Sequence, residues 1–167
     1  MRRRKDTMAE KIIETSQGQF TVKEEDRICF PEGIYAFEEL KYFYLINMDE
    51  DNVFQMLQSE EKPDTAFIMI NPYLFKKDYV LNIRDEDLKA IGIQEKNASA
   101  ALTVYAIVTI TENFMTANLL GPVVINIESK IGKQALALNQ DYSTKHDILE
   151  EFNTNKSLRE ALGVSAG

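Results

Sequence analysis

The sequence contains one cysteine, Cys29, and one histidine, His146. A single cysteine excludes an internal disulfide framework and suits a reducing compartment. With so few cysteines and histidines, a zinc site would lack its usual ligands. No stretch approaches the roughly 18 uncharged apolar residues of a membrane helix, and the basic start lacks the apolar segment of a secretion signal. We therefore expect a cytoplasmic protein without a membrane segment, metal or other cofactor.

Catalytic motifs are equally scarce. The segment 163–167 has the letters of a nucleophile elbow, but it lies at the extreme C-terminus, where no helix can follow it. Ile127 stands where a P-loop would have its first glycine, and Gln134 replaces the Ser/Thr of that motif. The acidic clusters fall in predicted turns or helix starts, where solvated carboxylates are usual. We expect no enzyme, although a paired-carboxylate mechanism stays open because its two acids can come from distant segments.

Charge is unevenly distributed along the chain. Residues 1–6 carry +3 of a total of −8, so the remaining residues carry −11. Such an acidic body repels nucleic acid and attracts basic protein partners. We expect no direct nucleic-acid binding, and we interpret residues 1–10 as a disordered basic extension.

Short runs rich in β-branched and aromatic residues dominate the chain, with Gly, Asn-Pro and Lys-Pro-Asp as punctuation between them. The strand-like runs are 11–15, 19–22, 26–30, 42–46, 53–57, 66–70, 79–83 and 101–110. Their number and spacing predict a mainly β fold: a small, single-domain, barrel-like structure at 11–149 with one or two short helices.

The helical signals are few. Residues 37–43 could form one or two turns. In 84–93, Asp85 is the predicted N-cap, Leu88 and Ile91 face inward, and Gly92 ends the helix. A capping box at 157–160 opens a segment too short to be stable alone, so we predict a weakly ordered tail at 150–167.

The stretch TANLLGPVVIN, residues 116–126, joins two strand-like halves through Gly121-Pro122. Proline cannot donate to a sheet ladder, so the kink belongs at a sheet edge, a bulge or a turn. Asn118 and Asn126 could be buried amides that lock the turn, or they could mark an open edge that accepts a partner.

Protein interfaces favour aromatic and methionine anchors. Tyr35 and Phe37 lie in a predicted turn, where they form either a contact surface or a satellite cluster. Phe54 and Gln58 share one face of the run 53–59, in which neither face is purely polar. This pattern indicates either burial on both sides or an exposed apolar edge. The candidate partner-binding residues are Tyr35, Phe37, Phe54, Gln58, Asn118, Leu119, Leu120 and Pro122.

Five stretches together resemble the FliW family of flagellar assembly factors. They are FPEGIYAFEELKYFYLI (30–46), FQMLQS (54–59), Asn71-Pro72, TANLLGPVVIN (116–126) and GKQALAL (132–138). They occur in the family's order, within a match from about residue 12 to 149. The family commonly has Pro-Gly where this chain has Ile34-Tyr35-Ala36.

The resemblance implies a monomeric, barrel-like, non-catalytic cytoplasmic protein with two partners. These are flagellin and the translational repressor CsrA, whose capture would release flagellin mRNA. The alternative is a small-ligand-binding β-barrel or a carboxylate-dependent enzyme, which would need a deep apolar pocket with convergent polar groups.

Overall fold

A closed β-barrel forms the centre of the molecule. The computed structural model describes residues 9–94 and 101–154 of the 167-residue chain. Within them, antiparallel pairing joins neighbouring strands from β3 to β8 and then β8 to β9, and β9 lies parallel to β3 through Ile131 and Cys29. The barrel strands are β3 (Ile28–Cys29), β4 (Tyr42–Asn47), β5 (Phe54–Ser59), β6 (Ala66–Ile70), β7 (Leu102–Ile110), β8 (Met115–Asn126) and β9 (Ile131–Gln134). The predicted mainly β, barrel-like fold is confirmed.

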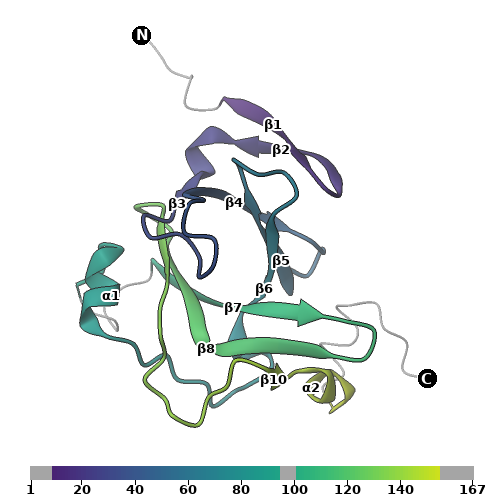
Figure 1. The fold of residues 1–167 in the computed structure, drawn as a ribbon, viewed down its shortest axis with the longest axis vertical. Helices are drawn as coiled ribbons and strands as arrows, with labels where there is room; N and C mark the ends of the chain where they lie inside the picture. The colour runs from purple at the N-terminus through teal and green to yellow at the C-terminus, as the bar shows by residue number, and fades with distance from the viewer. Residues whose placement is uncertain (1–8, 95–100, 155–167) are drawn as a thin grey trace.

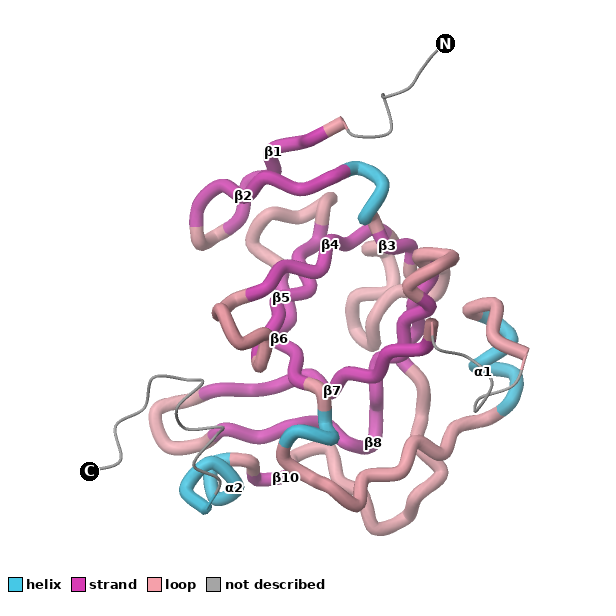
Figure 2. Tube along the Cα trace, turned by 180° about the vertical axis from the view of Figure 1, so that it is seen from behind, coloured by secondary structure: helices cyan, strands magenta, loops and turns pink. Residues whose placement is uncertain are grey.

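Smaller elements surround the barrel (Figures 1 and 2). The hairpin of β1 (Glu10–Thr15) and β2 (Gly18–Lys23) stands beside β4, and Lys11 Nζ reaches Glu60 Oε2 at 2.7 Å. The strand β10 (His146–Asp147) pairs with one half of β8. The helices are α1 (Asp85–Ala90) and α2 (Leu149–Thr154), with 3-10 turns η2 (Glu24–Asp26) and η3 (Pro72–Leu74).

Apolar side chains fill the interior of the barrel. They alternate along the strands with residues that face outward, as the two-residue period of a strand requires. Phe30 and Phe43 are fully buried there, and their rings meet edge to face at 5.2 Å. Gly132 is crowded against Phe30, since a Cβ at this position would lie 2.5 Å from the Phe30 ring. The interior is therefore a packed core and not a ligand cavity.

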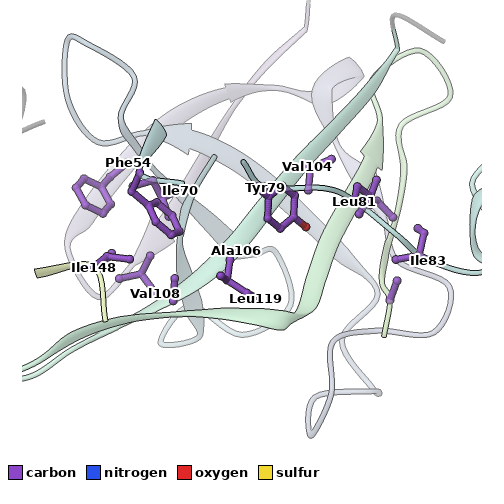
Figure 3. Close-up of a cluster of buried hydrophobic side chains, with 14 of the residues drawn as sticks. Phe54, Ile70, Tyr79, Leu81, Ile83, Val104, Ala106, Val108, Leu119 and Ile148 are labelled. Atoms are coloured by element: carbon purple, nitrogen blue, oxygen red, sulfur yellow. The ribbon is translucent and has the colours of Figure 1, made fainter. Parts of the chain in front are cut away.

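A second core lies outside the barrel wall (Figure 3). Outward-facing residues of β5 to β8 pack there against the segment 71–94 and against Ile148 beside β10. Strand β5 contributes to both cores, with Phe54 in the outer one and Leu57 in the inner one. This double burial explains why its sequence has no polar face, and it confirms the core interpretation of Phe54.

Two predicted elements are absent from the described structure. Residues 79–83 are extended, with Tyr79, Leu81 and Ile83 buried, but they join no sheet. Buried and exposed residues alternate in this segment because it lies over the outer core, and not because it pairs with another strand. Residues 37–43 form turns and the start of β4 rather than a helix, because Phe37 and Leu40 pack toward the barrel core from tight turns.

Helix α1 follows the prediction at its C-terminal end. Leu88 and Ile91 are buried, and Gly92 has a φ of 85°. The Gly92 and Ile93 N–H groups donate to the Lys89 and Leu88 carbonyls, which is the Schellman arrangement. The predicted N-cap is wrong by one residue: Arg84 occupies that position, and Asp85 is the first residue of the helix.

Strand β8 changes neighbours at its kink. Before the kink it pairs with β10, and from Val123 onward it pairs with β9. The register with β7 shifts opposite the kink, between Tyr105 and Ile107. The predicted Pro122 break is therefore a bulge inside one long strand.

At the far end of β8, the buried Asn126 side chain joins two segments. Its Nδ2 donates to the Ile91 carbonyl at 2.9 Å, and its Oδ1 accepts from the N–H groups of Glu128 and Ser129. The amide thus anchors the end of α1 and shapes the turn into β9. Asn126 is a locking amide, as one of the two sequence interpretations held.

Replacing Asn126 with alanine should lower the free energy of unfolding by about 2–3 kcal/mol, because three backbone groups would lose their partner. Urea unfolding followed by circular dichroism measures the change. Asn82→Ala is the matched control, since that side chain is exposed. Equal stability of the two variants would contradict the anchoring role.

Candidate protein-binding groove

A tight turn between β3 and β4 presents Tyr35 to solvent. The Phe37 N–H donates to the Ile34 carbonyl at 2.7 Å, and the Ala36 N–H donates to Glu38 Oε2 at 2.9 Å. Ile34 is buried and the Phe37 ring packs edge to face on Phe67, so the turn is fixed from both ends. Tyr35 between them is 52% exposed.

Ala36 holds this turn in an unfavourable conformation. Its φ is 72°, in the left-handed region that costs an L-residue about 1–2 kcal/mol. Glycine usually occupies such a position. This chain therefore forms the turn with alanine, although glycine adopts the left-handed conformation more readily.

The buried side chain of Gln134 ties the turn to the kink of β8. Its Oε1 accepts from the Tyr35 N–H at 2.9 Å, and its Nε2 donates to the Gly121 carbonyl at 3.0 Å. A Cβ on Gly121 would lie 3.0 Å from the side-chain nitrogens of Asn118 and Gln134. Asn118 Oδ1 in turn accepts from the N–H groups of Leu120 and Gly121. The two amides satisfy backbone groups that the kink removes from the ladder.

The chain after β9 adds exposed leucines beside this turn. The Ala135 and Ala137 N–H groups donate to the Pro122 and Leu120 carbonyls, so the segment continues alongside β8. The alanines are buried, whereas Leu136 and Leu138 are 53% and 49% exposed. Both leucines and Tyr35 line a hollow of about 370 Å³. We call it the Tyr35 groove; its other exposed lining residues are Glu32, Glu38 and Arg84.

Buried charges support the floor of the groove. Asp87 is 1% exposed and accepts from Arg84 at 3.0 Å and from Lys133 at 2.9 Å. Lys133 also reaches Glu32 at 3.0 Å. Burial alone would raise the pKa of Asp87, but the hydrogen bonds from Arg84 and Lys133 outweigh burial and hold that pKa below its ordinary value. These contacts connect α1, β9 and the segment before the turn.

A second hollow, of about 310 Å³, also borders Tyr35. Its lining includes Phe67, Ile107, Asn118 and Lys145. Tyr35 therefore borders two depressions, one lined by leucines and acids and the other by threonines and two amides.

A family model described as FliW protein matches residues 11–148. This chain belongs to the FliW family. The flagellar assembly factor FliW of Leptospira interrogans serovar Lai is 43% identical over 133 residues, which cover 80% of this chain and 89% of that protein. FliW of Syntrophomonas wolfei is 40% identical over 142 residues, covering 84% and 89%. A crystal structure of the flagellar assembly factor FliW superposes with a TM-score of 0.74 at 33% identity, covering 83% of this chain and 96% of that one.

The FliW fold separates the eight candidate residues into two groups. Tyr35 is exposed, and Phe37, Asn118 and Leu120 are half-buried. The other four are buried: Phe54, Gln58, Leu119 and Pro122. Gln58, for example, donates to the carbonyls of Ser59, Pro63 and Thr65 within a turn.

Sequence reasoning missed Leu136 and Leu138 as surface residues. The alternation of Ala and Leu in GKQALAL was the available signal, because it matches a strand with one small, buried face. The other lining residues come from the segment after β3, from the start of α1 and from β9, which only the folded chain brings together.

Replacing Ala36 with glycine should raise the free energy of unfolding by about 1 kcal/mol, because the left-handed strain disappears. Thermal and urea unfolding measure the gain. Ala90→Gly is the matched control. Ala90 is the last residue of helix α1, where glycine is less favourable than alanine, so this variant should be less stable than the unmodified protein. A destabilised Ala36→Gly protein would contradict the strained-turn interpretation.

Replacing Lys133 with methionine should cost about 2–3 kcal/mol at neutral pH, because Asp87 would stay charged and buried with one cation fewer. The folded-state pKa of Asp87 is depressed, so its contribution to stability is present above its unfolded pKa of about 3.9 and is lost as the pH falls through the folded value. In the variant this loss should begin at higher pH.

Urea unfolding at a series of pH values between neutral and acidic tests both effects. Lys62→Met serves as the control, since Lys62 is exposed. If both lysine variants unfolded alike at every pH, the supporting role of the buried charges would be wrong.

Proposed function

We propose that this protein regulates flagellar assembly by binding CsrA and, alternatively, flagellin, and that it acts without catalysis. The observation that carries the proposal is the Tyr35 groove. Its three half-exposed apolar side chains stand on a frame of buried amides and ion pairs. That frame is built from stretches that resemble FliW motifs.

The groove has the composition of an interaction surface. Aromatic and apolar anchors surrounded by a polar rim are the residues that dominate protein interfaces. Here Tyr35, Leu136 and Leu138 are the anchors, while Glu32, Glu38 and Arg84 form a charged rim of net negative sign. The rim agrees with the net charge of −8, which favours basic partners.

CsrA, as an RNA-binding repressor, has to present a basic surface. An acidic protein bound beside that surface would disfavour RNA by repulsion without covering the RNA site. Salt limits such repulsion to a Debye length of about 8 Å at physiological ionic strength, so binding has to be close to the RNA site. Flagellin that accumulates before secretion would then capture the free factor in the cytoplasm and restore repression.

A small-ligand-binding barrel is less well supported. The barrel interior is packed with buried side chains such as Phe30, Phe43 and Leu57. The hollows described above lie on the outer surface and are open to solvent. Among the acids, Asp87 and Glu60 are engaged by lysine and arginine side chains, which favours a structural role for them over a catalytic one.

Leu136→Glu should weaken binding of CsrA, of flagellin or of both by at least about tenfold, because it places a charge among the apolar anchors. Calorimetric titration with each purified partner, alone and in competition, measures the effect. The free variant should keep its stability, since Leu136 is 53% exposed.

Ile12→Glu is the control variant, since it also replaces an exposed aliphatic side chain with a carboxylate. Ile12 lies in β1 and is 63% exposed, and this variant should bind both partners normally. Unchanged binding of both partners by Leu136→Glu would rule out the groove as the interface. Failure of the unmodified protein to bind either partner would rule out the proposed function.

A further inference from the structure

Strand β7 extends past the end of its neighbour β6. The pairing between them covers only Ala106 to Val108, opposite Ile70 to Ile68. After Ile70 the chain leaves the sheet through Asn71 and enters η3. Residues 102–105 therefore have β8 on one side and, among the described residues, no strand on the other.

The register identifies the backbone groups on this open edge. The Ile127 N–H donates to the Ala101 carbonyl at 2.9 Å. Hydrogen-bonded and non-hydrogen-bonded pairs alternate along an antiparallel ladder, so Thr103 and Tyr105 bond to β8. The N–H and C=O groups of Leu102 and Val104 point the other way, toward the open side.

These groups face a hollow of about 560 Å³ between β7 and the segment 71–81. Tyr73 and Val80, on its opposite wall, are 46% and 54% exposed. The described lining residues are uncharged, and none of them lines the Tyr35 groove. An unpaired sheet edge thus borders an apolar and aromatic wall.

We propose that this edge groove, defined by Asn71, Tyr73, Val80, Leu102 and Val104, binds an extended segment of a partner protein as an added β-strand. The free N–H and C=O groups of Leu102 and Val104 are two residues apart, and a second extended chain can form hydrogen bonds with groups at this spacing. The uncharged wall selects apolar side chains on the face that points into the groove. The net charge of −8 favours basic side chains on the outward face.

This site is independent of the Tyr35 groove, so a partner could occupy each at the same time. The segment it accepts is recognised through its backbone, whereas the Tyr35 groove presents side chains. The two surfaces can therefore be disabled separately.

A capped hexapeptide of alternating lysine and valine is the probe, and the same peptide with N-methylated valines is its control. In the free full-length protein, the amides of Leu102 and Val104 should exchange with deuterium about a hundredfold faster than those of Thr103 and Tyr105. Millimolar probe should slow exchange at Leu102 and Val104 and shift their NMR signals. The N-methylated peptide should do neither, because it cannot donate the ladder hydrogen bonds.

Val80→Lys should weaken probe binding about tenfold and leave CsrA and flagellin titrations unchanged, whereas Leu136→Glu should leave probe binding unchanged. Protected Leu102 and Val104 amides in the free protein would overturn the proposal. So would equal binding of both peptides, or no response to the probe. Loss of CsrA and flagellin binding alone would instead bear on the proposed function.

Discussion

The architecture depends on a single strand, β8, which pairs with a different strand on each side of a bulge. Its first half supports β10 and its second half supports β9, so the chain must leave the regular ladder between them. Gly121 and Pro122 make this change of direction, and the freed backbone groups are satisfied by the side chains of Asn118 and Gln134. Without those amides the bend would bury unpaired polar groups, each costing about 1–3 kcal/mol. Closure of the barrel through β9 therefore depends on them.

The same hydrogen bonds determine what the surface displays. Gln134 uses one end of its amide for β8 and the other for Tyr35. The position of the exposed tyrosine is thus coupled to the bend inside the barrel wall. Ion pairs between α1, β9 and Glu32 complete the connection. Such buried pairs add little net stability compared with apolar packing, but their geometry fixes how the elements meet.

Most strands could be predicted because one face or both are buried, which leaves a clear apolar pattern in the sequence. Residues 79–83 show that pattern too, yet they form no ladder, because alternate burial also results when an extended segment lies across a core. Helix α1 was predictable through Gly92, whose positive φ ends it. Residues 37–43 were misassigned because their apolar side chains serve turns.

The candidate surface was only partly predictable. Tyr35 was a candidate because an aromatic residue in a turn is less often core than one in a strand, but the same reasoning selected Phe37, which packs toward the barrel core. Phe54 and Leu119 could not be distinguished from surface residues, since apolar anchors and apolar core have the same composition. Leu136 and Leu138 reach Tyr35 only through the pairing of the segment after β9 with β8. That pairing is a long-range contact without a local signature.

The segment 79–83 also explains why residues 102–105 of β7 have, among the described residues, no strand on the side away from β8. Its buried residues Tyr79, Leu81 and Ile83 are held by the outer core, so the segment covers the face of the wall instead of extending the sheet. Its backbone finds other partners, with the Val80 N–H donating to the Tyr142 hydroxyl and the Asn82 carbonyl accepting from Leu138. A segment engaged in this way cannot also pair with β7. The packing that shields the outer core therefore leaves Leu102 and Val104 facing a hollow in place of a strand.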